Sequence, residues 1–353
     1  MRSVNTTPAI EAPVIQLTGL RKTFGSITAV DGIDLTIQSG EVVALLGPNG
    51  AGKSTSIDLA LGFATPTAGS ATLFGGNPRS AIDEGRVGAM LQGGALLPDL
   101  TVRQAVSLIA AAHRHPLPVQ EALERARVAD IAKQKVRKLS GGQLQRARFA
   151  VAIVSNPDLI FLDEPTAAMD VEARRTFWQS MREFTDAGRT VVFATHYLDE
   201  ADAYADRIVM LADGRVVADG APAEVKAVVA GRRIRATFDF AWTADAAAEL
   251  YELPGVRTVD RRGDVLTIVS DDPDAALRTL LSNHDDVHDI EVTAHSMDDA
   301  FLALTTNAGT APPVELVGTT SRDAGLDLDQ RERDMLDQRR QPTDESTLIG
   351  DRS

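Results

Sequence analysis

A glycine-rich segment in the first part of the chain has the residue types and spacing of a phosphate-binding loop. It follows an apolar run at 42–46 that predicts a buried strand, and it precedes apolar residues at helical spacing that stop at Gly62. Glycines let backbone N–H groups turn inward around an anion, and a helix start adds the positive end of its dipole. The segment consists of Gly47, Pro48, Asn49, Gly50, Ala51, Gly52, Lys53, Ser54 and Thr55. We expect Lys53 to meet the β- and γ-phosphates of a nucleotide and Ser54 to bind Mg²⁺; the alternative is a plain glycine turn.

Two carboxylates and one histidine follow two further apolar runs. Asp163 and Glu164 come after the run at 159–162, and His196 comes after the predicted strand at 190–194. An acidic residue at the carboxyl end of a buried strand predicts a Mg²⁺ ligand, here Asp163. Glu164 is then placed to polarise an attacking water, and His196 faces the same crevice. The alternative for the two carboxylates is a solvent-facing pair at a strand end.

A second glycine-containing segment follows the basic stretch at 133–138 and precedes a predicted helix at 144–154. Its residues are Leu139, Ser140, Gly141, Gly142 and Gln143. A helix start with glycines and a hydroxyl suits another phosphate contact. One chain does not need two such sites for a single γ-phosphate, so we infer that this segment serves a neighbouring subunit.

Together these motifs resemble those of the ATP-binding cassette (ABC) ATPases, and the resemblance covers about residues 14–231. It implies that 47–55 is the Walker A motif and that 139–143 is the signature motif, which binds the nucleotide of a partner subunit. Asp163 then corresponds to Walker B and Glu164 to the catalytic glutamate.

The same resemblance implies roles for four single residues. Phe24 matches the position that stacks on adenine, where tyrosine is usual; from composition alone, core packing is equally open. Gln92 matches the Q-loop glutamine, which senses Mg²⁺ and the lytic water, and Asp170 matches the D-loop. His196 matches the switch histidine that contacts the γ-phosphate. The implied catalytic set is Glu164, His196, Gln92 and Lys53, and the implied metal ligands are Ser54, Gln92 and Asp163.

The resemblance also implies partners. Two copies of the chain are expected to close head to tail on two Mg·ATP and to power a membrane permease on a separate chain, at the cytoplasmic face of the membrane. The run at 195–202 is similar to that of drug- and antibiotic-export cassettes of the daunorubicin-resistance type, which favours a drug, antibiotic or other hydrophobic cargo. The alternatives are export of a lipid, polysaccharide or ion, a soluble ABC mechanoenzyme, and a regulatory module with a small ligand bound at 232–306.

The resemblance implies an α/β fold that positions these residues: a P-loop cassette with a β-rich lobe, a RecA-like core and a helical insertion. We expect a flexible leader at 1–13 and the ABC ATPase domain at 14–231, with helices at 100–112 and 119–136 inside a helical subdomain at about 95–155. The order of predicted elements in 232–306 is βαββαβ, which is typical of a small ferredoxin-like α+β domain. The polar segment at 307–353 predicts a disordered acidic tail.

Composition and charge argue against several classes of protein and partner. The net charge is −14, and residues 232–353 hold 25 acidic but only 13 basic side chains. Without a basic stripe, we expect no nucleic-acid partner. The chain has no cysteine, which excludes disulfides and thiolate chemistry. No apolar run approaches the length of a membrane span, and residues 1–13 lack the apolar core of a signal peptide.

Overall fold

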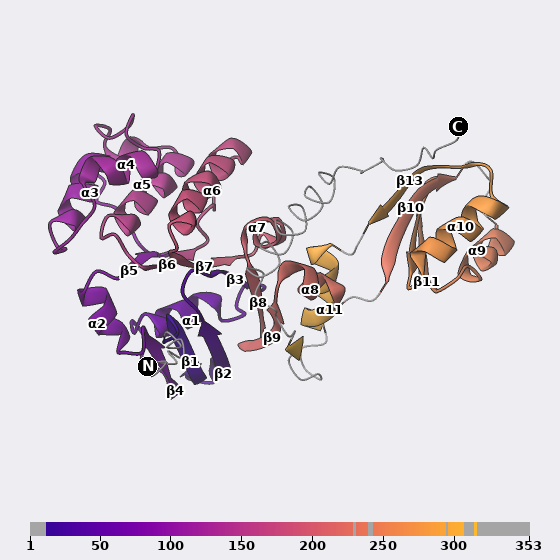
Figure 1. Cartoon of the computed structure of the whole chain (residues 1–353), viewed down its shortest axis with the longest axis horizontal. Coiled ribbons are helices and arrows are strands. Elements are labelled where there is room, and N and C mark those ends of the chain that lie inside the picture. The colour runs from indigo at the N-terminus through magenta and orange to yellow at the C-terminus, as the bar shows by residue number, and fades with distance from the viewer. Residues whose placement is uncertain (1–11, 229–230, 239–242, 294–295, 307–313, 316–353) are drawn as a thin grey trace, which may run out of the picture. The chain divides into compact units, whose positions relative to one another are not determined.

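The computed structural model describes residues 12–228, 231–238, 243–293, 296–306 and 314–315 (Figure 1). The predicted leader and tail therefore lie outside the described residues, apart from 12–13 and 314–315. The residues in these ranges form three sheets, with seven, four and three strands. Among the described residues, every helix is too short or too polar to cross a membrane.

The seven-stranded sheet has the order β14-β9-β8-β3-β7-β6-β5, and its neighbours are parallel except for the β8–β9 hairpin. Its strands are β3 (Val42–Leu46), β5 (Val87–Met90), β6 (Leu159–Asp163), β7 (Thr190–Thr195), β8 (Arg207–Ala212), β9 (Arg215–Gly220) and β14 (Val314–Glu315). All residues of β3, β6 and β7 are buried, because both faces of a parallel sheet are covered. These three adjacent strands end at one edge of the sheet, where the predicted phosphate loop, carboxylates and histidine begin.

Alternation along β3 divides the interior into two cores. Val42, Ala44 and Leu46 face one hydrophobic cluster, whereas Val43 and Leu45 face the other. The helices of this part of the chain are α1 (Lys53–Ala60), α2 (Pro78–Asp83), α3 (Val102–Ala110), α4 (Val119–Arg125), α5 (Gly141–Ile153), α6 (Val171–Asp186), α7 (Leu198–Tyr204) and α8 (Pro222–Ala227). A short 3₁₀ helix spans Val136–Lys138. The cluster of Val42 includes residues of α3–α6, and the cluster of Val43 includes residues of α1.

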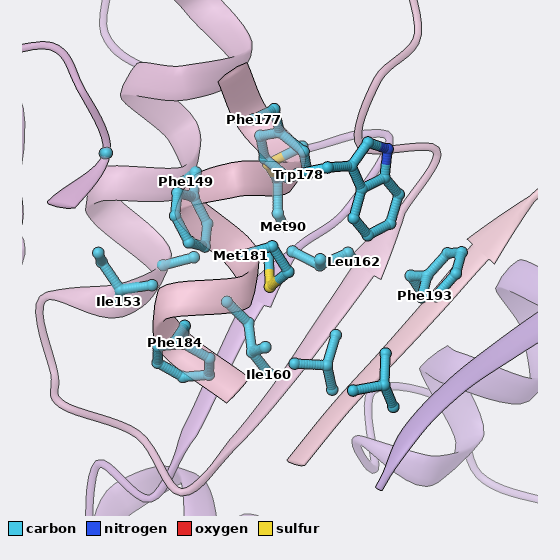
Figure 2. Packing of buried hydrophobic residues seen from close by; sticks show 14 of the residues in the cluster. Met90, Phe149, Ile153, Ile160, Leu162, Phe177, Trp178, Met181, Phe184 and Phe193 are labelled. Carbon is cyan, nitrogen blue, oxygen red and sulfur yellow. The ribbon is translucent and has the colours of Figure 1, made fainter. Parts of the chain in front are cut away.

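Aromatic side chains fix α6 against the sheet (Figure 2). The ring of Trp178 lies edge-on to Phe193 of β7 with centroids 4.8 Å apart, and it stacks on Tyr204 at 4.4 Å. Phe177 contacts Phe149 of α5 at 5.3 Å. Such pairs add stabilisation beyond the apolar area that they bury. They hold the start of α6, where the predicted D-loop lies, in a fixed relation to β7.

A smaller antiparallel sheet has the order β2-β1-β4, with β1 (Ile15–Phe24), β2 (Ile27–Ile37) and β4 (Ala68–Leu73). In β2, Ile33, Leu35 and Ile37 are buried while Asp34 and Thr36 are exposed, which is the alternation of a strand with one face in the core. This β-rich lobe contacts α1.

The third sheet has the order β11-β12-β10-β13 and is antiparallel throughout. Its elements are β10 (Arg232–Phe238), α9 (Ala244–Tyr251), β11 (Val256–Arg262), β12 (Val265–Ser270), α10 (Pro273–Asn283) and β13 (Val287–Thr293). This is the ferredoxin-like arrangement that the βαββαβ order predicts. The predicted fold class, a P-loop cassette with a small α+β unit, is confirmed.

Two segments differ from expectation. The helix expected at 119–136 ends at Arg125, because Arg127 takes a positive φ of 53°, and the chain continues through turns to the 3₁₀ helix at Val136–Lys138. Helix α11 (Met297–Thr306), which the sequence places with the ferredoxin-like unit, contacts α7, α8 and β9. Its buried residues Met297, Ala300 and Leu304 belong to the same cluster as Ala201 and Val225.

Candidate nucleotide-binding site

Two glycines of the phosphate loop take a positive φ. Gly50 and Gly52 have φ of 84° and 99°, and Gly52 caps the start of α1. A Cβ on Gly52 would lie 2.4 Å from the carbonyl oxygen of Ala29, so a side chain cannot be accommodated there without displacing the backbone. Gly50 and Gly52 therefore determine the conformation of the loop that precedes Lys53.

The ammonium of Lys53 lies over the loop that precedes it. Its Nζ donates hydrogen bonds to the carbonyl oxygens of Gly47 at 2.6 Å and Pro48 at 3.1 Å. Burial lowers the pKa of Lys53, and the charges of Glu164 and Asp163 act in the opposite direction. A buried cation at a loop of backbone amides is suited to a polyphosphate.

Asp163 is the last residue of β6 and is only 5% exposed. The Ser54 hydroxyl favours the ionised form of its carboxylate and so acts to lower its pKa, but Oδ1 is buried and has no hydrogen-bond partner. Burial raises the pKa of Asp163, which shows that desolvation outweighs the favourable contacts with Ser54 and Lys53. A buried carboxylate oxygen without a donor, next to a hydroxyl, is a donor set that fits a hard cation such as Mg²⁺.

Glu164 and His196 face each other across the ends of β6 and β7. Oε2 of Glu164 lies 2.7 Å from Nδ1 of His196, and these side chains are 12% and 46% exposed. The backbone of Glu164 has a φ of 50°, which is uncommon outside glycine, and its N–H donates to the carbonyl of Ala194 at 2.9 Å. A partly exposed carboxylate fixed by an imidazole is suited to orienting a water.

The segment at 139–143 begins α5. Ser140 caps the helix, with Gln143 N donating to Ser140 Oγ at 3.3 Å and Ser140 N donating to Gln143 Oε1 at 3.0 Å. A Cβ on Gly141 would lie 2.9 Å from the carbonyl oxygen of Ala168, so this glycine permits close contact with the segment that leads to α6. Within the described residues, none of the hydrogen bonds of 139–143 reaches the phosphate loop.

The remaining predicted residues are Asp170, Gln92 and Phe24. Asp170 caps α6 through a 2.7 Å hydrogen bond to its side chain from Ala173 N. Gln92 lies in an exposed turn after β5. Phe24, the last residue of β1, presents a ring that is 52% exposed, with Lys22 Nζ 5.0 Å from its centroid. Core packing is thereby excluded for Phe24, and its ring is accessible to a ligand.

Comparison with known proteins decides the family. The ABC transporter family model matches residues 30–167. The daunorubicin/doxorubicin resistance ATP-binding protein DrrA of Streptomyces peucetius is 34% identical over 82% of this chain and 92% of its own length. The chain belongs to the ABC transporter ATP-binding proteins. This ABC subunit is also 32% identical to the Nod factor export ATP-binding protein I of Rhizobium sp. strain N33, over 82% of the chain and 96% of that relative.

Solved structures agree with the assignment. A dimeric bacterial ABC transporter cassette is 29% identical, has a TM-score of 0.55, and is covered over 98% of its length by 59% of this chain. Cassettes of this family bind ATP and hydrolyse it to drive transport; they dimerise and act with membrane permeases. The ABC subunit described here is thus an ATPase of the export type.

Two side chains at the site of this ABC subunit were not anticipated from the sequence. Arg148 of α5 donates a hydrogen bond to the carbonyl of Leu91, next to Gln92, and another to Gln145 Oε1 at 3.0 Å. In the sequence, Arg148 stands between the apolar residues Ala147 and Phe149, and this position could have indicated that its side chain is partly buried. Glu200 is buried in the first turn of α7, and only the helical spacing to Tyr204 distinguishes it from its exposed neighbour Asp199.

Proposed function

We propose that this ABC subunit hydrolyses ATP with Glu164 as the group that orients or activates water. Lys53 and the amides of the phosphate loop hold the β- and γ-phosphates, and His196 contacts the γ-phosphate. Phe24 stacks on adenine. The observation that carries the proposal is the 2.7 Å contact between Glu164 and His196, at the same sheet edge as the phosphate loop. A positioned base of this kind contributes about 10²–10⁴ in rate.

Mg²⁺ fits the site because Asp163 Oδ1 is buried without a hydrogen-bond partner. Ser54, Asp163 and Gln92 would hold the ion. When bound, the ion neutralises charge on the phosphate oxygens.

The complete site is shared by two copies of the chain. The residues at 139–143 make no hydrogen bond to the phosphate loop of their own chain among the described residues, so they are available to a second copy. Asp170, at the start of α6, lies close to this segment: Gly141 packs near Ala168, and Gly142 packs near Ala173, whose N–H donates to Asp170. The dimeric state of a solved cassette supports this arrangement.

The names of the relatives support a proposal for the cargo class. Those named for daunorubicin and doxorubicin resistance support export of a drug, antibiotic or other hydrophobic compound through a separate permease, with the subunit at the cytoplasmic face. The relatives named for Nod factor export match the chain over a similar length and favour a second candidate cargo of that kind. Transport assays with each compound, in vesicles that contain the chain and its permease, separate the two. ATP-driven movement of neither compound would contradict both candidates.

The hydrolytic assignment is tested with Glu164→Gln, which keeps the shape of the side chain but removes its basicity. We expect turnover to fall at least 100-fold while ATP binding is retained. Glu84→Gln, an exposed carboxylate at the end of α2, is the matched control and should retain wild-type turnover. Unchanged hydrolysis in Glu164→Gln would overturn the role of Glu164.

A further inference from the structure

One buried carboxylate has no part in the chemistry above. Among the described residues, the buried charged side chains are Lys53, Asp163 and Glu200. The first two belong to the phosphate site, whereas Glu200 lies in α7 and is only 2% exposed. A carboxylate is costly to bury unless donors surround it. The identity of those donors therefore indicates what Glu200 holds in place.

Two hydroxyl donors and one guanidinium, from three segments, converge on Glu200. Thr166 Oγ1 donates to its Oε1, and Thr195 Oγ1 donates to its Oε2 at 3.1 Å. Arg174 forms an ion pair, with Nε 3.3 Å from Oε1. The same guanidinium lies 4.6 Å from the centroid of the Tyr197 ring. The carboxylate thus joins the segment after β6, the end of β7 and the first turn of α6.

Each hydroxyl belongs to a segment that carries one half of the Glu164–His196 pair. Thr166 lies two residues after Glu164, whose backbone takes the unfavourable φ of 50°. Thr195 directly precedes His196, and its hydroxyl also accepts a hydrogen bond from the N–H of Tyr197 at 3.0 Å. The Thr195 hydroxyl is therefore bonded both to Glu200 and to the backbone N–H that follows His196, and these two bonds restrict the backbone at His196.

We propose that Glu200 is a positioning residue for hydrolysis. Its two carboxylate oxygens each hold one threonine, and through these threonines they keep Glu164 and His196 at hydrogen-bonding distance. Glu200 is only 2% exposed and both of its carboxylate oxygens are bonded to threonine hydroxyls, so we expect its substitution to lower kcat and to leave nucleotide binding unchanged. This inference rests on the proposed catalytic role of Glu164 and His196.

The test is Glu200→Gln in the full-length chain, with Asp199→Asn as the matched control because Asp199 is the exposed neighbour on the same helix. An amide nitrogen cannot accept a hydrogen bond from a hydroxyl, so the hydrogen bond from one of the two threonines is lost. We expect kcat for MgATP to fall at least 10-fold, with KM within about twofold of wild type. Thr195→Val and Thr166→Val leave Glu200 intact. Each variant removes one of the two hydroxyl hydrogen bonds to Glu200, and each should lower kcat.

A double-mutant comparison separates positioning from general stability. If Glu200 acts through the pair, Glu200→Gln should change kcat less than about twofold in a His196→Ala background, because the geometry that it maintains is already lost. An equal fold-change in both backgrounds, or wild-type kcat in Glu200→Gln, would overturn the inference. Loss of turnover in Glu164→Gln together with wild-type turnover in Glu200→Gln contradicts the positioning role alone, whereas normal turnover in Glu164→Gln contradicts the proposed function itself.

Discussion

Glu164 and His196 are 32 positions apart in the chain, yet Oε2 of the carboxylate and Nδ1 of the imidazole lie 2.7 Å apart. Adjacent strands bring them together: Asp163 of β6 is paired with Ala194 of β7, and each functional residue follows directly after its strand ends. The contact is therefore a property of the parallel sheet, and the left-handed backbone of Glu164 directs the side chain toward it.

Replacing His196 with alanine removes the partner that orients Glu164. We expect kcat to fall by about 10²-fold or more, since a positioned proton-transfer group contributes 10²–10⁴. KM for ATP should change less than about threefold, because His196 provides only one contact with the γ-phosphate, and Lys53 and the loop amides are untouched. Steady-state phosphate release measures both constants, and a variant that loses ATP binding but keeps kcat would contradict this role.

Asp163→Asn should stabilise the protein in the absence of nucleotide while abolishing turnover. Burial raises the pKa of Asp163 in the folded chain, outweighing the attraction of Lys53. The ionised carboxylate therefore destabilises the fold, and this penalty sets in as pH rises through the folded-state pKa. Thermal unfolding at pH 7 should give a higher Tm for the variant, and the difference should shrink as pH falls toward the ordinary carboxyl range.

With MgATP added, the wild type should become more stable than Asp163→Asn. Binding at 100 times Kd stabilises the wild type by about 2.7 kcal/mol, and the variant, which lacks the metal ligand, gains less. A variant that is less stable than the wild type without nucleotide would contradict the assigned desolvation of Asp163.

Leu304→Ala tests the packing of α11 on the cassette. Leu304 is 9% exposed and lies in the cluster that includes Ala201 of α7, so its truncation should cost about 2–4 kcal/mol of unfolding free energy. Leu302, on the same helix, is 62% exposed, and Leu302→Ala should cost less than about 0.5 kcal/mol. Urea unfolding of both variants measures the difference; equal effects would show that α11 does not bury Leu304 against the cassette in solution.

Much of the fold can be predicted from the sequence because local signals and topology agree. Gly62 ends α1 as predicted: its φ is 70°, and the hydrogen bonds from Gly62 N to Leu59 O and from Phe63 N to Asp58 O form a Schellman motif. Asp213 and Gly214 both have positive φ and close the β8–β9 hairpin, as an Asp-Gly turn predicts. In each case one or two residues determine the backbone.

What the sequence does not predict depends on distant contacts. Glu200 and Asp199 are adjacent acidic residues in one helix. The helical spacing to Tyr204 indicates which of them is buried, but it does not predict the hydrogen bonds from Thr166 and Thr195 to Glu200. The periodicity of α11 predicts an apolar face but not that this face contacts α7 and α8. The early end of α4 at Arg125 reflects a local turn that the apolar spacing at 119–136 obscures.

The central claim, that one chain supplies half of each catalytic site, is tested most directly by the mass of Glu164→Gln in solution. The chain has a mass of 37.7 kDa. Light scattering should give this mass without nucleotide and twice this mass with saturating MgATP, because ATP is bound but not hydrolysed and the closed dimer accumulates. A monomeric mass at saturating MgATP, with ATP shown to be bound, would contradict the shared site.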